Sequence, residues 1–429
     1  MNFFPIINSV LSNFVNWILQ NKYPLIFYTI IFLVVYLNRK KFEIQAKIIA
    51  LYRTKIGLNF IEKAGTKYKE LIKLFGYIGV GIGFIGMVYI TVLLASSFVN
   101  IFIQPKAPSA FAPVVPGVKI PGSPIVFPFW YTIISLFLVT IVHEAAHGLV
   151  AKAHGLKVES TGIAFFGPLL AAFVEPNEDQ IKKQEDIVQY SIFSAGPFSN
   201  IIFALLAVVI LSFAVSPVIS SLQVTQGYSF YSITPNSPAF NASVPANQIF
   251  TKFNGVKITN KDQFYSLLSG IEPGQKISIE NDENNYEFEA VANPQLENNP
   301  DLLKQNPEYP KAIIGITASG TGEFIQIHKK DELKYSAPIL KLTYQIFNIF
   351  SNFLFWFFVL SSGIGIANLL PLGPVDGGRM LQVVFQKIIK KEKKANDIWV
   401  KVSLVTFALV LISFLFPIIR AIVTSLGFI

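Results

Sequence analysis

The sequence predicts a polytopic α-helical membrane protein with about six transmembrane helices. Of its 429 residues, 52% are hydrophobic and 14% are charged, whereas about 25% of residues are charged in an ordinary soluble domain. Six apolar runs are long enough, or nearly so, to cross a hydrocarbon core of about 30 Å. These runs cover residues 23–38, 74–103, 124–152, 187–218, 343–371 and 399–427.

The basic residues that give the net charge of +9 cluster beside the apolar runs. This distribution favours a lipid bilayer over nucleic acid as the partner of the positive charge. Cytoplasmic loops carry the excess of Lys and Arg, so we expect residues 39–73, Lys182–Lys183 and Lys387–Lys394 to be cytoplasmic. The polar segment 219–335 should then lie outside. The N-terminus lacks a basic n-region and a small-residue cleavage site, so no cleaved signal peptide is expected.

A metal-binding pattern, His143-Glu144-Ala145-Ala146-His147, lies inside the third run. Positions i and i+4 of a helix share one face, so both imidazoles can reach one Zn²⁺. Glu144 is set off by about 100° and can reach a water molecule instead. An ionisable group at the centre of a membrane helix costs about 2.5–3.5 kcal/mol, so a compensating cation is expected. The chain has no Cys, which excludes thiolate ligands.

Asp376 is the predicted third ligand. It follows the fifth run in the segment Asn368–Arg379, where Pro and Gly residues break the helix and let the chain turn a carboxylate towards a buried site. The alternating topology puts it at the same depth as the two histidines. An ordinary turn or cap role is the alternative. Glu175 is the best substitute ligand, whereas turn, interface or surface positions are expected for Glu159, His154 and His328.

These motifs together resemble the site-2 protease family of intramembrane zinc metalloproteases. In addition to HExxH and the Asn-x-x-Pro…Asp-Gly motif at 368–377, Ser194–Asn200 resembles the family's Gly-Pro-x-x-Asn segment at the start of its middle core helix. Gly162–Pro176 resembles the membrane-dipping β-structure that follows the HExxH helix. The resemblance covers the third to fifth helices, as a three-helix catalytic core. In its lack of Cys and its short N-terminal part, the chain resembles the prokaryotic, archaeal-like branch of the family.

The polar segment 219–335 resembles a PDZ module inserted into this core. Tyr231–Ala239 is similar to the opening strand and turn, and Ile249–Gly255 to a later strand that ends in an Asn-Gly hairpin turn. One departure is Asn247, where this module usually has an acidic residue. We also expect a short helix at 261–268 and strands at 276–280, 286–292 and 313–317.

The resemblance implies hydrolysis of peptide bonds in single-pass transmembrane substrates near the cytoplasmic side, as in regulated intramembrane proteolysis. One Zn²⁺ per chain, held by His143, His147 and Asp376, would keep a fourth position open for a water whose pKa falls towards about 7. Glu144 would be the general base. Asn200 and Asn368 are expected to hold the unwound substrate backbone, or to tie helices together.

The expected protein is a multi-pass protein of the cell membrane, with its active site towards the cytoplasm and the PDZ-like domain extracytoplasmic. We expect this domain to exclude substrates with an untrimmed ectodomain. The predicted parts are an accessory segment with two transmembrane helices (1–123), the first part of the catalytic core (124–218), the PDZ-like domain (219–335), the Asp-Gly part of the core (336–384) and a C-terminal transmembrane helix (385–429).

Two other functions fit parts of the pattern. A membrane-tethered metallopeptidase of another family would carry HExxH on an amphipathic helix, whereas the helix here is apolar on both sides of the motif. A non-catalytic membrane scaffold would recruit partners through the PDZ-like domain and would not need Glu144.

Overall fold

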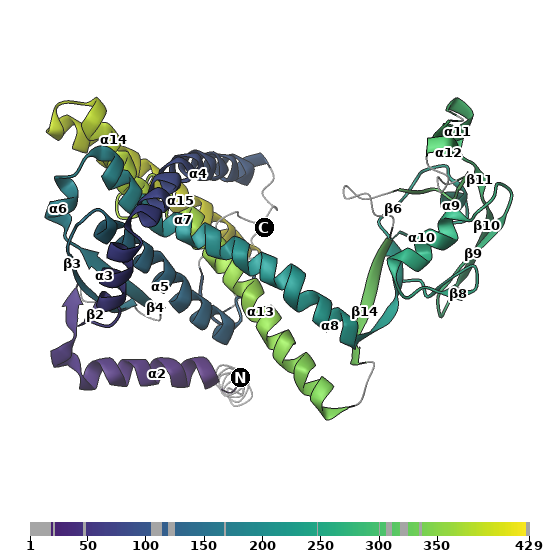
Figure 1. Cartoon of the computed structure of the whole chain (residues 1–429), viewed down its shortest axis with the longest axis horizontal. Coiled ribbons are helices and arrows are strands. Elements are labelled where there is room, and N and C mark those ends of the chain that lie inside the picture. Colours follow the sequence, from purple (N-terminus) through teal and green to yellow (C-terminus); the bar gives the residue numbers. More distant parts are fainter. Residues whose placement is uncertain are drawn as a thin grey trace, which may run out of the picture. The chain divides into compact units, whose positions relative to one another are not determined.

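The structure is a computed structural model. It describes residue 19 and residues 22–45, 49–103, 114–118, 125–166, 169–246, 248–299, 301–305, 311–317, 325–333 and 337–425. The chain divides into two compact units (Figure 1). The first combines Met1–Phe213 with Phe350–Ile429, and the second is Ala214–Ile349. The predicted PDZ-like segment falls within the second unit, and the sequence-based domain limits remain predictions.

Five helical segments in the described part of the chain are long and apolar enough to cross a membrane. This supports a multi-pass membrane protein, while the count of six spans stays a prediction. The first predicted span is the helix α2 (Lys22–Leu37), which is apolar but has 16 residues. The five are α4 (Lys69–Ile103), α5 (Phe129–Ala153), α7 (Asp186–Ile210) continued through a π-helical turn (Leu211–Val215) into α8 (Ser216–Leu222), α13 (Pro338–Ala367) and α15 (Glu392–Ser425).

Local sequence signals set the ends of the helix that carries HExxH. Pro128 precedes α5 in an extended conformation. Its ring would clash with a helical turn before it, so the helix begins at Phe129. At the other end, Gly155 takes φ +84°, a left-handed conformation that favours glycine and stops the helix after His154. The motif therefore lies in the C-terminal half of an intact helix.

A four-stranded antiparallel sheet packs against α5. Its order is β1 (Glu43–Gln45), β2 (Ile49–Thr54), β3 (Val158–Phe166) and β4 (Leu169–Pro176). The β3–β4 hairpin is the β-structure expected after the motif helix. The first two strands, and the helix α3 (Leu58–Lys67) after them, come from a segment for which the sequence predicted only a basic loop. Gly162 permits this packing, because a Cβ there would collide with the Phe173 ring and the Tyr52 carbonyl.

The core of the first unit forms around α7, which packs against α4, α5 and α14 (Asp376–Ile388). Helix α4 packs closely against α5, α7 and α14 through buried glycines. A Cβ at Gly76 would lie 3.0 Å from Val150 and 3.2 Å from Ser191, and a Cβ at Gly83 would lie 3.0 Å from Met380. Small residues let backbones of membrane helices approach in this way, so α4 contacts all the helices that carry the predicted site.

Two sequence-based placements were wrong. The fifth span ends at Ala367 instead of residue 371, and Asp376 is the first residue of a separate amphipathic helix, α14, which the sequence analysis did not predict. Ser194–Asn200 lies well inside α7 and not at its start. The end of the fifth span was predicted from apolar content, which does not register a helix boundary made by a turn. The position of Ser194–Asn200 at a helix start was implied by the family resemblance alone, whereas α7 begins at Asp186 and continues through Pro197.

The second unit is a small α/β unit of short strands. The predicted Asn-Gly hairpin is confirmed, because Lys252–Phe253 pairs with Val256–Lys257, and Asn254 and Gly255 both have positive φ. The predicted helix at 261–268 and the strand at 276–280 are also confirmed. The PDZ-like assignment stays a prediction, and Asn247 lies outside the described residues.

The elements of the second unit, in chain order, are β5 (Gln223–Phe230), β6 (Ser232–Ile233), α9 (Pro238–Asn241), β7 (Lys252–Phe253), β8 (Val256–Lys257), α10 (Lys261–Ser269), β9 (Lys276–Glu280), β10 (Asn285–Glu289), β11 (Val291–Ala292), α11 (Pro294–Asn298), α12 (Leu302–Gln305), β12 (Ala312–Ile313), β13 (Ile316–Thr317) and β14 (Ile325–Leu333).

Aromatic side chains form the core of the second unit. Tyr228, Phe230, Phe250, Phe253 and Phe264 are each at most 1% exposed, and the rings of Phe253 and Phe264 meet edge to face with centroids 5.1 Å apart. Burial raises the pKa of Tyr228 far above its ordinary value, so its phenol stays neutral and donates to the Lys252 carbonyl. The second unit therefore has an aromatic core that is separate from the core around α7.

Replacing Phe264 by Ala should destabilise the second unit by about 3–5 kcal/mol, because the ring is fully buried among other aromatic side chains. Phe240→Ala is the matched control, since this ring is 49% exposed and its loss should cost about 0.5 kcal/mol or less. Limited proteolysis in a urea series, with cleavage scored between residues 214 and 349, measures both. Equal urea sensitivity of the two variants would contradict the assigned core.

Candidate metal centre and active site

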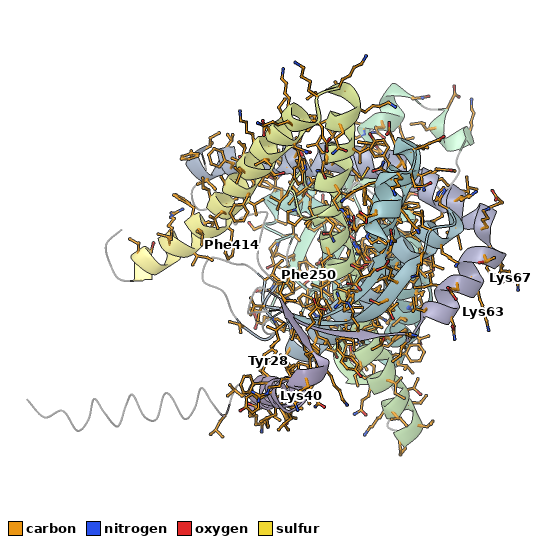
Figure 2. All side chains as sticks on the ribbon, turned by 90° about the vertical axis from the view of Figure 1, so that its left-hand side faces the viewer. Tyr28, Lys40, Lys63, Lys67, Phe250 and Phe414 are labelled. Carbon is orange, nitrogen blue, oxygen red and sulfur yellow. The ribbon has the colours of Figure 1, made fainter. Side chains whose placement is uncertain are left out.

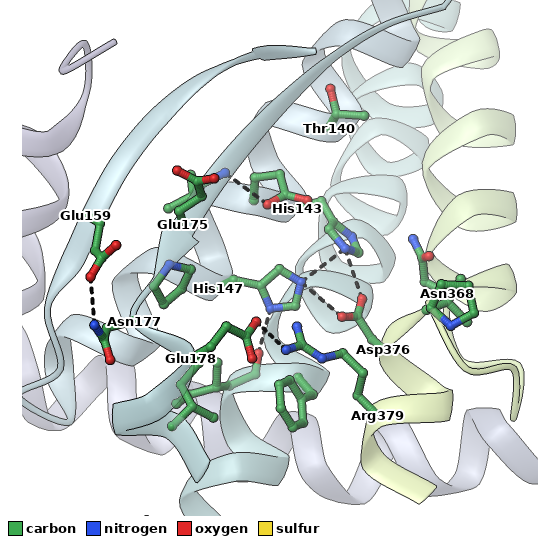
Figure 3. Close-up of a pocket in the computed structure, with 18 of the residues that line it drawn as sticks. Thr140, His143, His147, Glu159, Glu175, Asn177, Glu178, Asn368, Asp376 and Arg379 are labelled. Carbon is green, nitrogen blue, oxygen red and sulfur yellow. Dashed lines mark hydrogen bonds and ion pairs between the residues drawn. The ribbon is translucent and has the colours of Figure 1, made fainter. Parts of the chain in front are cut away.

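The two histidines of the motif and Asp376 meet at one buried point (Figure 3). His143 and His147 project from the same face of α5, and their Nε2 atoms are 3.1 Å apart. Asp376 reaches them from the first turn of α14, with Oδ2 3.0 Å from His143 Nε2 and Oδ1 3.4 Å from His147 Nε2. Each of the three residues is 7–8% exposed. The tertiary fold thus joins residues 233 positions apart.

The donor atoms fit a zinc ion. In a tetrahedral site with bonds of about 2.0–2.1 Å, two ligand atoms lie about 3.3 Å apart. The two Nε2 atoms are 3.1 Å apart, and each lies 3.0 or 3.4 Å from one of the two oxygens of the Asp376 carboxylate. Among the described residues, no other group of three His, Asp or Glu side chains can bring its donor atoms within such reach. Gly196 of α7 leaves the space, because a Cβ there would collide with Nε2 of both histidines.

The ring of His147 is oriented by the backbone of α7. Its Nδ1 lies 2.6 Å from the carbonyl oxygen of Ile192, so Nδ1–H donates to this oxygen. The Nε2 lone pair is then free and points towards His143 and Asp376. Histidines that bind metals usually have their other ring nitrogen fixed in this way.

Asn200 of α7 contacts the ring of His143. The amide nitrogen Nδ2 is 3.1 Å from His143 Nδ1, while the amide oxygen Oδ1 is buried and has no hydrogen-bond partner among the described residues. A half-turn of the amide gives its oxygen a donor, His143 Nδ1–H, and leaves His143 Nε2 free for a cation. The Ser361 hydroxyl of α13 holds the Asn200 backbone carbonyl at 2.8 Å. Asn200 is therefore placed to orient a ligand ring, and it is not among the residues that line the cavity.

The carboxylate of Glu144 is held by strand β4. The Val174 N–H donates to Glu144 Oε2 at 3.1 Å, and the Ala172 N–H donates to Thr140 Oγ1 at 2.9 Å. Four residues of a helix and two of a strand advance by similar lengths, about 6.0 and 6.7 Å. The two contacts therefore hold β4 alongside α5. One carboxylate oxygen of Glu144 is engaged, and the residue lines the cavity.

The turn before Asp376 is fixed from two sides. The Gly377 N–H donates to the Asn368 carbonyl at 2.7 Å, and the Trp399 indole of α15 donates to the Gly378 carbonyl at 2.8 Å. Side chains at 377 or 378 would collide with the backbone of Leu369 or Leu372. The Asp-Gly-Gly sequence thus lets α14 begin against the preceding turn, with its first carboxylate facing α5.

A cavity of about 690 Å³ opens beside the three donor groups. Its lining includes Glu144, Asn368 and the side chains of the donor triad. Arg379 of α14 lies at the same cavity, paired with Glu178 and 4.4 Å from the centroid of the Phe193 ring. Figure 3 shows Asn368 on the opposite side of the Asp376 carboxylate from His147. The cavity is polar enough to admit water and large enough for an extended peptide segment.

The other candidate ligands have different partners. Glu175 lies at the cavity, but it forms a two-pronged ion pair with Arg53 at 2.7 and 2.9 Å, and this hydrogen bonding lowers the pKa of its carboxyl. Glu159 accepts from the Asn177 amide at 2.6 Å. His154 contacts the Ser191 hydroxyl at 3.2 Å, and in the second unit His328 contacts Ser229 at 2.8 Å. None of the four joins the donor triad.

Sequence reasoning missed Thr140 and Trp399. Thr140 had a local signal, because it precedes Glu144 by one helical repeat of four residues and shares its face. Trp399 had none, since its contact with Gly378 depends on how α15 packs against α14. The Ile192 carbonyl is a backbone group and carries no side-chain signature.

The sequence profile of peptidase family M50 matches residues 131–411, which include both halves of the donor triad. The chain belongs to peptidase family M50. This is the site-2 protease family, and the protein is a zinc metalloprotease of the membrane. The other-family metallopeptidase and the non-catalytic scaffold considered from the sequence are therefore set aside.

Similar proteins agree with the M50 assignment. The chain is 26% identical over 384 residues to an uncharacterized protein of Methanocaldococcus jannaschii, covering 87% of this chain and 88% of that protein. It is 25% identical over 315 residues to a protein of Clostridium perfringens named as a candidate zinc metalloprotease, covering 62% and 90% of the two chains. A membrane-bound transcription factor site-2 protease homolog of Arabidopsis thaliana is 23% identical over 212 residues, covering 49% and 40%.

In this M50 protease, replacing Asn200 by Ala should lower zinc affinity about 10–100-fold, the usual cost of losing a group that orients a ligand ring. Asn368→Ala is the matched control, because Asn368 lines the cavity and contacts no ligand ring. Zinc retention in a graded series of chelator concentrations measures both. If the two variants lost zinc equally, Asn200 would have no special role at His143.

Trp399→Phe keeps an aromatic ring but removes the donor to the Gly378 carbonyl. Loss of one such hydrogen bond costs about 1 kcal/mol, so zinc should bind about fivefold more weakly if the contact positions Asp376. Trp356→Phe on α13 is the control, since Trp356 packs against Phe127 and lies away from this turn. Competition with a zinc-binding dye gives both affinities. Unchanged affinity in Trp399→Phe would remove the positioning role.

Proposed function

We propose that this M50 protease is an intramembrane endopeptidase that hydrolyses peptide bonds of single-pass transmembrane substrates near the cytoplasmic side. The observation that carries the proposal is the donor triad of His143, His147 and Asp376, whose ligand atoms lie within 4.8 Å of one another beside a polar cavity. In the proposal these three side chains hold one Zn²⁺. Bound there, the ion supplies the Lewis acidity that polarises a peptide carbonyl and acidifies a water molecule.

Glu144 is the general base in this proposal. It lies on α5 between the two histidines in sequence and lines the same cavity, but it does not belong to the donor triad. Its carboxylate accepts a proton from the attacking water and passes it to the leaving amine. The Val174 N–H holds one carboxylate oxygen and so limits the orientations of the other.

The substrate backbone must be unwound before a carbonyl becomes accessible, because a helix hides its carbonyls in hydrogen bonds. In the proposal Asn368 holds this unwound segment, since its side chain lines the cavity beside Asp376. Asn200 acts differently and orients His143. The distribution of lysine and arginine supports an orientation with the active site towards the cytoplasm and the second unit outside.

Glu144→Gln should lower the rate of peptide-bond cleavage about 10²–10⁴-fold, the usual contribution of a general base, with zinc content unchanged. Asp376→Ala should lose zinc as well as activity. Glu159→Gln is the matched control, because Glu159 lines the cavity outside the donor triad and should tolerate the change. Cleavage of a single-pass substrate in proteoliposomes, together with metal analysis, reads out all three.

Full zinc retention in Asp376→Ala would contradict the ligand assignment. Cleavage by Glu144→Gln at the wild-type rate would contradict its role as the base. Cleavage of water-soluble peptides alone, with the membrane substrate left intact, would contradict the substrate class.

A further inference from the structure

Helix α3 packs directly on the end of the catalytic helix. Its inner face consists of Ile61, which is 3% exposed, and the buried Gly65. A Cβ at Gly65 would lie 2.8 Å from Lys152 Cβ, and a Cβ at Gly148 would lie 3.1 Å from Ile61 Cδ1. Gly148 directly follows His147, so α3 contacts α5 beside the donor triad.

The outer face of α3 is basic and partly apolar. Phe60 is 63% exposed, and Lys63 and Lys67 are exposed as well. At about 100° per residue these three side chains fall within an arc of about 60°, roughly opposite Ile61 and Gly65. Figure 2 shows Lys63 and Lys67 projecting from the same outer side of the helix. Ile56, which is 82% exposed, precedes the helix and adds to the apolar surface.

Within the described residues, no acidic side chain pairs with the lysines of this outer face. The neighbouring acidic residues are engaged elsewhere, Glu62 with Lys152 and Glu70 with Lys73. Within the described part of the chain, neither Lys63 nor Lys67 forms an ion pair, and Lys67 contacts only the ring of Tyr68 as a cation–π pair. The face therefore keeps its positive charge.

The apolar surface continues from α3 into a membrane-spanning helix. Helix α4 begins at Lys69, and the side chains of its first turns, Leu71 and Leu74, are 66% and 54% exposed. An exposed leucine on a membrane-spanning helix faces lipid. The lysines of α3 thus lie within a few residues of the start of a helix that is long and apolar enough to cross a membrane.

We propose that the outer face of α3 binds the headgroups of anionic phospholipids and thereby steadies the end of α5 that carries HExxH. Lysines on an interfacial helix attract anionic headgroups, while aromatic and aliphatic side chains beside them enter the boundary of the acyl chains. Phe60 and Ile56 supply the apolar contact, and Lys63 and Lys67 supply the charge. An acidic soluble protein would match the charge alone, so exposed apolar residues continuous with α4 favour lipid.

The experiment uses the full-length purified protein in neutral detergent micelles, titrated with phosphatidylglycerol or phosphatidylcholine. Thermal unfolding is followed by tryptophan fluorescence, so the readout does not depend on the proposed protease mechanism. Phosphatidylglycerol should raise the Tm, and phosphatidylcholine should not. Each lysine near an anionic surface contributes about fivefold in affinity. The double variant Lys63→Gln/Lys67→Gln should therefore need about 25-fold more phosphatidylglycerol for half of the Tm shift.

Two variants serve as controls. Lys63→Arg/Lys67→Arg keeps the charge and should keep the lipid response. Lys257→Gln/Lys276→Gln removes two exposed lysines from the second unit and should also keep it. Amide hydrogen exchange at residues 148–154 should slow in phosphatidylglycerol in the wild type but not in the Lys→Gln double variant.

Several outcomes would overturn the proposal. One is an equal response of the wild type and the Lys→Gln double variant to phosphatidylglycerol. Another is an equal Tm shift with soluble glycerol phosphate, which would point to a free-anion site. A lipid-dependent Tm shift without slower exchange at 148–154 would remove the coupling to α5.

Discussion

The meeting of two imidazoles and one carboxylate in a buried position constrains the rest of the first unit. Such groups are costly in a membrane-embedded core unless they share a cation or pair with one another. His143, His147 and Asp376 come from two helices far apart in sequence, and their donor atoms stand 3.0–3.4 Å apart. Groups that share a metal ion must be held within about 0.5 Å of their productive positions, so both helices have to be held firmly.

The packing around this point supplies that support. Helix α7 contributes the Ile192 carbonyl to one ring and the Asn200 amide to the other, and Gly196 leaves the space between them. Helix α15 reaches the start of α14 through the Trp399 indole. The buried glycines of α4 let it lie close to these elements. Elements outside the three helices of the expected catalytic core therefore position the groups within it.

The cavity rim is assembled from distant segments as well. Glu175 of β4 lines the cavity and is bound from behind by Arg53 of strand β2, which does not line the cavity itself. Strand β4 is held on α5 by Thr140 and Glu144. Arg379 of α14 pairs with Glu178 just after β4. The carboxylate that would act as base is thus part of the contact between a strand and a helix. Rearrangement of β4 would change the orientation of Glu144, because the two are hydrogen-bonded.

The sequence by itself determined the features that depend on neighbouring residues. Apolar length predicted the membrane helices, i and i+4 spacing predicted that His143 and His147 share a face, and the Asn254-Gly255 pair predicted a hairpin. Tertiary structure alone decided that Asp376 begins a separate helix, that Asn200 faces His143, that β1 and β2 join the β3–β4 hairpin, and that β5 pairs with β14. The physical reason is that helix periodicity and turn geometry act over a few residues. Contacts such as Trp399 with Gly378 depend on the packing of whole helices, for which no local pattern exists.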